Sequence, residues 1–396
     1  MITPLLPTYA RVPIAFERGE GMYLFDENGK KYLDFYAGIG VMCLGHCHPT
    51  LVNALCDQAH KLWHTANTYR IPLGEKLAQR LVDNSFADTV FFTNSGAEAI
   101  ECAIKMVRKY HYDKGNKGKH RLITMSSAFH GRTLAGIAAA GQEKLVKGFD
   151  PLPGGFDVVP FGDIEAVKAA IGPETGGIMV EPIQGEGGIR PVPVDVMRAL
   201  RDLCDENGLL LVFDEIQCGM GRTGKLFAHE WSDITPDIVT SAKGIGGGFP
   251  LGACLATEDA ASGMTVGTHG STYGGNPLGM AVGNAVMDEM LKPEFLPRVK
   301  QMGDLLQGRL AALQQRHGDF IQEVRGMGLM AGIRLPDVPT KAATLDFTER
   351  GLLPAVAGDM VVRMLPPLIV EESHIDEAME IYDAAFEDWR KNGIPS

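Results

Sequence analysis

Long hydrophobic runs and an excess of basic residues are both missing from this chain of 396 residues. The longest apolar run, Gly244–Ala256, has 13 residues and contains five glycines and one proline. It is too short for a membrane-spanning helix, which needs about 18. Lys and Arg number 37 against 49 Asp and Glu, and the net charge of −12 argues against sequence-independent binding to nucleic acid or anionic membrane. We therefore expect neither membrane nor nucleic acid as a partner.

The cysteines and the first residues of the chain favour a cytoplasmic protein. Seven dispersed cysteines suit reduced thiols better than a disulfide framework. The N-terminal sequence lacks a basic segment followed by an apolar segment and a cleavage site, so we expect no secretory leader. Hydrophobic residues make up 45% and charged residues 22%, which is the balance of a globular protein with two or three domains' worth of core.

The middle of the chain alternates short apolar runs with helical periods, a pattern typical of an α/β fold with a mostly parallel sheet. Near-continuous apolar runs of this length suit strands buried on both faces. The predicted strands are Arg121–Met125, Phe156–Pro160, Gly177–Glu181, Leu209–Asp214, Asp237–Ser241 and Gly252–Ala256. The predicted helices are Ala97–His111, capped by Ser95, and Val194–Asn207, ended by Gly208.

The two ends of the chain differ from the middle and predict a second domain of α+β type. Glu27-Asn28-Gly29 indicates a hairpin. Amphipathic helices are predicted over Arg298–Gln315 and Ile375–Lys391, on either side of Gly326–Ile333. We therefore expect residues 61–285 to form the large domain, and residues 1–60 and 286–396 to form one smaller domain together.

Four segments place reactive groups at strand ends or at a helix start. Asp214 ends an apolar strand, where the ligands of open α/β sheets bind. Lys243 follows another strand and is a candidate amine nucleophile. Ser95 caps a helix whose bare N–H groups suit a phosphate, and Phe129 adds an aromatic face after a third strand. Each segment alone also fits an ordinary turn or cap, but together they favour pyridoxal phosphate.

These segments belong to a longer series of motifs that resembles a known family. The chain resembles the class III aminotransferases of the fold-type-I pyridoxal phosphate superfamily, most closely the acetylornithine group. The resemblance runs almost end to end. Its motifs are GHCHP at 45–49, LWHTANTY at 62–69, NSGAEA at 94–99, FHGRT at 129–133, EPIQGEGG at 181–188, FDEIQCGMGRTG at 213–224, SAKGIGGGFPLGA at 241–253 and THGSTYGGNPL at 268–278.

The resemblance implies a role for each cofactor residue. Lys243 would bond to the cofactor and later move the proton between the substrate Cα and the cofactor C4′. Asp214 would keep the pyridine nitrogen protonated, and Gln217 would contact the phenolic oxygen. The other cofactor contacts would come from Ser95, Gly96, Ala97, Phe129, Glu215, Ile216 and, across a homodimer with shared sites, Thr272.

Four residues are implied to bind substrate. Arg132 would hold a carboxylate bidentately, and Ser271 would lie near the substrate. Glu186 would pair with Arg363 and mask it while an ω-amino substrate enters. Once released, Arg363 would receive a carboxylate of glutamate or 2-oxoglutarate. A purely structural ion pair is the alternative for Glu186 and Arg363.

The implied reaction moves the δ-amino group of N2-acetylornithine to 2-oxoglutarate in arginine biosynthesis, by a ping-pong mechanism. Alternatives on the same scaffold are ornithine, succinylornithine, succinyldiaminopimelate and 4-aminobutyrate transamination, and an aminomutase of the glutamate-1-semialdehyde type. The expected gate weighs against the aminomutase, because an enzyme with one substrate has little use for it. We expect no metal, since His46-Cys47-His48 are adjacent and cannot all face one ion. Cys218 is expected to be a buried thiol, and His130 to lie behind the residues that touch the cofactor.

Overall fold

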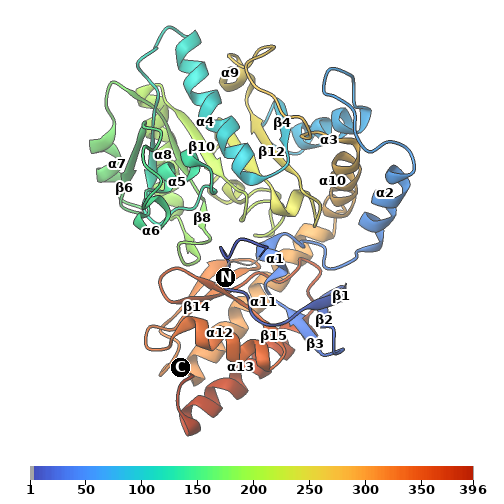
Figure 1. Cartoon of the computed structure of the whole chain (residues 1–396). Coiled ribbons are helices and arrows are strands. Elements are labelled where there is room, and N and C mark those ends of the chain that lie inside the picture. Colours follow the sequence, from blue (N-terminus) through green and yellow to red (C-terminus); the bar gives the residue numbers. More distant parts are fainter. Residues whose placement is uncertain (1–3, 396) are drawn as a thin grey trace.

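The computed structural model describes residues 4–395 and is built around a seven-stranded sheet (Figure 1). The strand order is β4-β12-β11-β10-β7-β5-β6. Only β12 runs antiparallel to its neighbours, so the predicted mostly parallel sheet is confirmed. The strands are β4 (Thr89–Thr93), β5 (Arg121–Met125), β6 (Phe156–Val159), β7 (Thr175–Val180), β10 (Leu210–Asp214), β11 (Ile238–Ser241) and β12 (Gly252–Ala256).

Helices cover both faces of this sheet, which explains why its strands are apolar throughout. On β10, Leu210 and Val212 pack into the core under α4, while Leu211 and Phe213 pack into the core on the other face. The helices of this part are α2 (Pro49–Ala59), α3 (Pro72–Asp83), α4 (Gly96–Asp113), α5 (Leu134–Ala140), α6 (Glu143–Val146), α7 (Ile164–Ala170), α8 (Val194–Asn207), α9 (Glu258–Ala261) and α10 (Pro277–Met290). Helix α8 has its predicted bounds and ends on the left-handed Gly208.

One predicted strand needs correction, and one strand of the sheet was not predicted. The strand predicted over Gly177–Glu181 is β7, which starts at Thr175 and ends at Val180. Glu181 leaves the sheet because the next residue is Pro182, which has no N–H for the ladder. Strand β4 was not predicted, because its central residues are only partly buried and its short sequence TVFFT has no strong alternation.

Both chain ends contribute to the lower part of the molecule, where blue and red segments lie together (Figure 1). Strand β15 pairs in parallel with β3, which joins the C-terminal part to the predicted N-terminal hairpin. The strands here are β1 (Phe16–Glu20), β2 (Tyr23–Asp26), β3 (Lys31–Asp34), β13 (Glu323–Met327), β14 (Met330–Arg334), β15 (Leu352–Leu353), β16 (Ala355–Ala357) and β17 (Val361–Met364). The helices are α11 (Phe295–Arg316), α12 (Thr340–Glu349) and α13 (Glu372–Asn392). The domain bounds themselves stay a prediction.

The two parts meet beside the carboxyl ends of β10 and β11. The short α1 turn (Ala37–Gly40) packs against the 3₁₀ turn η2 (Lys243–Ile245), which follows β11. A small hairpin of β8 (Ile183–Gln184) and β9 (Arg190–Pro191) lies nearby, and a second 3₁₀ turn, η1 (Ala228–Ser232), follows β10. Between residues 4 and 395, no helix is both long enough and apolar enough to cross a membrane.

Candidate active site

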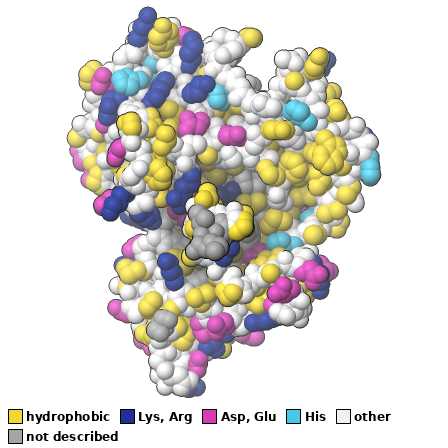
Figure 2. Space-filling view, viewed as in Figure 1, with side chains coloured by type: hydrophobic (Ala, Val, Ile, Leu, Met, Phe, Trp, Pro, Cys, Tyr) yellow, Lys and Arg dark blue, Asp and Glu magenta, His cyan; other side chains and the backbone are white. Residues whose placement is uncertain are grey.

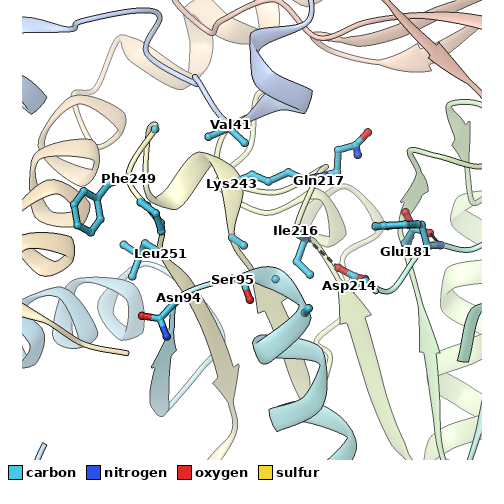
Figure 3. Close-up of a pocket in the computed structure, with 17 residues that line it drawn as sticks. Val41, Asn94, Ser95, Glu181, Asp214, Ile216, Gln217, Lys243, Phe249 and Leu251 are labelled. Atoms are coloured by element: carbon cyan, nitrogen blue, oxygen red, sulfur yellow. Dashed lines mark hydrogen bonds between the residues drawn. The ribbon is translucent and has the colours of Figure 1, made fainter. Parts of the chain in front are cut away.

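A cavity of about 350 Å³ opens at the carboxyl ends of the central strands. Lys243, Asp214 and Gln217 reach it from the ends of β11 and β10, and Ser95 reaches it from the start of α4 (Figure 3). The other residues that line it are Val41, Asn94, Gly96, Ala97, Phe129, Gly131, Glu181, Ile216, Ala242, Gly248, Phe249, Pro250 and Leu251. The topology therefore brings together the four segments that the sequence singled out.

The start of α4 forms an anion seat in the cavity wall. The Ser95 hydroxyl caps the helix by accepting from the Glu98 N–H at 3.3 Å. The first helical hydrogen bond runs from the Ala99 N–H to the Ser95 carbonyl, so the N–H groups of Gly96 and Ala97 precede it at the positive end of the helix dipole. A Cβ on Gly96 would come within 2.7 Å of Ile216, so glycine is required for this close approach.

Asp214 is a buried carboxylate held by three groups. Its Oδ2 lies 2.8 Å from Nδ1 of His130, and its Oδ1 accepts from the Thr240 hydroxyl at 3.2 Å and the Ile216 N–H at 3.1 Å. Burial alone would lower the pKa of His130, but the bond to Asp214 outweighs it and the pKa is raised. The predicted supporting position of His130 thus proves to be a direct contact with Asp214.

Lys243 lies in the wall of the cavity in a left-handed conformation, with φ of 50°. Burial lowers the pKa of its ammonium to about 8, and the positive charge of Arg363 acts in the same direction. The carboxylates of Glu186, Asp214 and Glu181 oppose the shift. An amine with this pKa loses its proton far more readily near neutral pH than an ordinary lysine does, which favours a role as nucleophile and proton carrier.

Gln217, Arg363 and Glu186 form a connected group beside Lys243. The Arg363 guanidinium donates to Glu186 at 2.5 Å and to the Gln217 side-chain oxygen at 2.9 Å. Arg363 is only 2% exposed, whereas Glu186 is 33% exposed. Burial alone would raise the pKa of Glu186, but Arg363 outweighs this and the pKa is lowered. The predicted ion pair is therefore present, with its carboxylate on the more open side.

The remaining predicted substrate residues lie outside the enclosed cavity. Phe129 lines the cavity, and the exposed Arg132 lies with its guanidinium carbon 5.5 Å from the Phe129 ring centroid. Ser271 accepts from the Gly274 N–H at 2.9 Å, and its hydroxyl lies 3.3 Å from the Asn94 amide nitrogen. Thr272 is exposed. Within one chain, Arg132, Ser271 and Thr272 thus flank the site rather than enclose it.

Glu215 is placed differently from its prediction. Its carboxylate accepts from the backbone N–H groups of Ala228 and His229, and lies 2.7 Å from the His229 ring nitrogen. Neighbouring strand-end residues point to opposite sides, so Glu215 faces away from the cavity that Asp214 lines. Its side chain anchors η1 and does not contribute to the cavity. Cys218, as predicted, is a buried thiol, and burial raises its pKa well above the usual value.

Glu181 is the functional candidate that residue-by-residue analysis of the sequence missed. It lines the cavity, and its carboxylate accepts from the Phe129 N–H at 2.9 Å and the Gly185 N–H at 3.1 Å. Burial raises its pKa to about 7; the positive charge of His130 opposes this shift and the negative charge of Asp214 adds to it. Glu181 begins the EPIQGEGG motif, but nothing in that pattern shows that its side chain turns into the cavity.

Comparison with known proteins agrees with this geometry. A family model described as aminotransferase class-III matches residues 7–386. The chain is 56% identical over 375 residues to the acetylornithine aminotransferase of Mesorhizobium japonicum, covering 95% of this chain and 94% of the relative. It is 56% identical over 382 residues to that of Agrobacterium fabrum, covering 96% of each chain.

Solved structures give the same result for the fold. The N-acetylornithine aminotransferase of Stenotrophomonas maltophilia superposes with a TM-score of 0.84 at 37% identity, covering 96% of this chain and 98% of that one. The ornithine aminotransferase of Toxoplasma gondii superposes with a TM-score of 0.94 at 29% identity, covering 98% of this chain and 93% of that one. The predicted fold class, with a large mostly parallel sheet and an α+β remainder, is confirmed.

Proposed function

The chain belongs to the class-III aminotransferases, and from that premise we propose how its cavity carries out transamination. It transfers the δ-amino group of N2-acetylornithine to 2-oxoglutarate, giving N-acetylglutamate 5-semialdehyde and glutamate in arginine biosynthesis. The observation that carries this substrate assignment is identity of 55–56% to acetylornithine aminotransferases over nearly the whole chain.

The enzyme uses pyridoxal phosphate, and the residues of the cavity fit it. The anion seat at Ser95 and Gly96 suits a phosphate, because it lies at the start of α4 in the wall of the cavity. The buried Asp214 carboxylate suits a protonated ring nitrogen, and Phe129 offers an aromatic face. Lys243 supplies the amine that holds the cofactor's aldehyde. When bound, the cofactor supplies an electron sink for the charge that forms when the substrate Cα loses its proton.

Each side chain of the site has one task in this scheme. Lys243 moves the proton at the substrate carbon, and its lowered pKa suits that exchange. Asp214 keeps the ring nitrogen protonated, and the His130 contact at 2.8 Å fixes its orientation. Gln217, which lines the cavity, would contact the cofactor's phenolic oxygen. Glu181 sets the position of the Phe129 backbone through its 2.9 Å hydrogen bond.

The Glu186–Arg363 pair lets one cavity accept two differently shaped substrates. While the pair is closed, Arg363 is masked and acetylornithine enters with its δ-amine first, its α-carboxylate on Arg132. When Glu186 swings toward solvent, Arg363 receives a carboxylate of glutamate or 2-oxoglutarate. The partial exposure of Glu186 beside a fully buried Arg363 supports Glu186 as the moving partner.

Steady-state kinetics test the substrate assignment. Acetylornithine, ornithine and 4-aminobutyrate are each supplied with 2-oxoglutarate, and kcat/KM is compared. We expect acetylornithine to exceed the other two by at least roughly tenfold, since a pocket that recognises the acylated amine discriminates on that scale. A higher kcat/KM for ornithine would contradict the assignment and favour the ornithine aminotransferases, whose fold this chain shares.

We propose further that the active unit is a homodimer with shared sites. Large aromatic side chains stand exposed in the loop after α2 and in the loop before α10, with Trp63 at 66%, Tyr69 at 71% and Tyr273 at 63%. Asn67 donates to the carbonyls of Ser271 and Gly274, so the two loops form one surface. In Figure 2, hydrophobic side chains gather on the right of the upper part, over the region where Figure 1 places α2, α3 and α10, as is typical of an interface. Thr272, exposed on it, would reach the partner's cofactor phosphate.

A mixing experiment tests the shared site. We expect Lys243→Ala and Thr272→Asp chains to be inactive alone, and subunits are exchanged between them. In a hybrid dimer both lesions fall in one site, and the other keeps Lys243 and Thr272 intact, so activity returns toward half of a normal dimer. Hybrids seen by native mass spectrometry without any return of activity would refute the role of Thr272.

We also place the enzyme in the cytoplasm, which its seven free thiols support.

A further inference from the structure

Arg222 is a buried cation whose place in the fold is not explained by the reaction. It is 2% exposed, and burial lowers its pKa to about 10. Among the residues that the structure describes, no carboxylate forms an ion pair with it. Burying a guanidinium without a counter-charge costs free energy, so the hydrogen bonds of Arg222 must offset part of that cost.

Those hydrogen bonds join three separate segments. The Arg222 guanidinium donates to the Pro366 carbonyl, and to the Leu329 carbonyl at 3.2 Å. The Arg222 backbone carbonyl in turn accepts from the Leu329 N–H at 3.0 Å. Arg222 lies in the loop after β10, Leu329 in the turn between β13 and β14, and Pro366 just after β17. One side chain therefore binds the loop that follows Asp214 to the C-terminal part of the chain.

Pro366 is close in sequence to the substrate-facing arginine. Arg363 lies on β17, whose backbone pairs with β14 and β16 of the C-terminal sheet. After β17, Pro366 and Pro367 have no N–H and cannot continue the ladder. The Leu365 and Leu368 N–H groups on either side donate to the Phe35 and Cys43 carbonyls at 2.7 Å, and between them the Arg222 side chain binds the Pro366 carbonyl.

The loop after β10 and the segment containing β17 are thus tied at two points. The first tie is in the site, where Arg363 donates to Gln217 at 2.9 Å. The second is behind the site, from Arg222 to Pro366. The Arg363–Gln217 hydrogen bond must weaken when Arg363 turns to a substrate carboxylate. The Arg222–Pro366 hydrogen bond need not change.

We propose that Arg222 is a positioning residue for Arg363. Its hydrogen bond to the Pro366 carbonyl, which we call the clamp, holds the segment after β17 against the loop after β10 and so orients the Arg363 side chain toward the cavity. The proposal rests on the function proposed above, in which Arg363 receives a carboxylate of 2-oxoglutarate. Without the clamp, Arg363 stays in the protein but loses its alignment for the dicarboxylate. Acetylornithine, which enters while Arg363 is paired with Glu186, depends on that alignment less.

The test compares Arg222→Met with a matched control. Arg298→Met removes another arginine that donates to backbone carbonyls of the same C-terminal stretch, at Leu368, Ile369 and Val370, but from α11 rather than from the loop after β10. Both variants are measured for thermal unfolding, for KM of each substrate and for binding of glutarate, a dicarboxylate that cannot react.

We expect Arg222→Met to raise KM for 2-oxoglutarate and Kd for glutarate by roughly tenfold, because small misplacements of a binding group cost this much or more. KM for acetylornithine should change less than about threefold, and Arg222→Lys, which keeps a donor, should recover most of the loss. Arg298→Met should lower Tm without changing the ratio of the two KM values. Equal effects on both substrates, or none, in Arg222→Met would overturn the proposal. If Arg222→Met does not fold, Arg222→Gln, whose shorter and uncharged side chain does not span the distance to the Pro366 carbonyl, carries the same comparison, and an unchanged KM ratio in Arg222→Gln overturns the proposal.

Arg363→Lys separates this proposal from the function on which it rests. If Arg363→Lys leaves KM for 2-oxoglutarate unchanged, the role of Arg363 itself is wrong. If Arg363→Lys raises that KM and the Arg222 variants do not, only the clamp is wrong.

Discussion

Replacing Glu186 by alanine should change which substrate the enzyme prefers rather than abolish its activity. In the parent, Glu186 pairs with Arg363 at 2.5 Å, and a glutamate carboxylate must displace it. In Glu186→Ala, Arg363 keeps only the Gln217 oxygen at 2.9 Å and stays unmasked. Glutamate then gains access without the cost of opening the pair, and acetylornithine loses the closed arrangement that it uses.

The size of the effect follows from the buried position of the pair. A hydrogen bond between charged groups is worth about 1.5–3 kcal/mol net. Since about 1.4 kcal/mol corresponds to a factor of ten, the ratio of kcat/KM for glutamate to that for acetylornithine should rise by roughly 10- to 100-fold. Because Arg363 holds the pKa of Glu186 below its usual value, the change should persist across neutral pH.

The assay is the rate of each half-reaction, followed through the cofactor absorbance at several substrate concentrations. Glu186→Gln keeps the size and an acceptor but not the charge, so its ratio should lie between those of the parent and Glu186→Ala. Glu165→Ala, which breaks an ion pair on the exposed face of α7, should leave the ratio unchanged. An unchanged ratio in Glu186→Ala would refute the gate and leave a structural ion pair.

Three further predictions concern residues inside the cavity. Lys243→Ala should show no transamination while its thermal unfolding stays close to that of the parent, and turnover near the parent's would refute its role. Asp214→Ala should slow loss of the substrate Cα proton by orders of magnitude, measured by exchange with deuterated solvent, because an unprotonated ring cannot hold the developing charge; a loss under about tenfold would contradict this. For Glu181, burial raises the pKa in the folded protein to about 7, above its pKa in the unfolded chain. Between these two pKa values the unfolded chain loses the proton first, so the free energy of unfolding falls as the pH rises. The Tm of Glu181→Gln relative to the parent should therefore increase from pH 5 to pH 8 in the cofactor-free protein, and a constant difference would contradict the buried, raised pKa.

Local patterns predicted those parts of the fold that depend on neighbouring residues. Strand β5 and helix α8 have their predicted bounds, and Ser95 caps α4 as expected, because apolar periodicity and capping are set within a few residues. Strand β4 escaped prediction because its half-exposed residues derive their pairing from β12, more than 150 positions away. Such a pairing leaves no trace in a short sequence window.

In the site, too, the sequence predicts features set by neighbouring residues and misses those set by distant contacts. The sequence motifs located Asp214, which ends β10, and Lys243, which follows β11. The direction of Glu215 depends on the η1 turn that its carboxylate anchors, and the inward turn of Glu181 depends on the distant Phe129 N–H. The clamp from Arg222 to Pro366 spans 144 positions, and no spacing within the GMGRTG motif points to it.

The most direct test of the central claim is a single half-reaction without an amino acceptor. The enzyme loaded with cofactor is mixed with acetylornithine alone, and the absorbance of the cofactor and the release of N-acetylglutamate 5-semialdehyde are followed. We expect one equivalent of semialdehyde per site, conversion of the cofactor to its amine form, and full reversal with release of glutamate once 2-oxoglutarate is added. Continuous turnover of acetylornithine without 2-oxoglutarate, or no change in the cofactor, would contradict it.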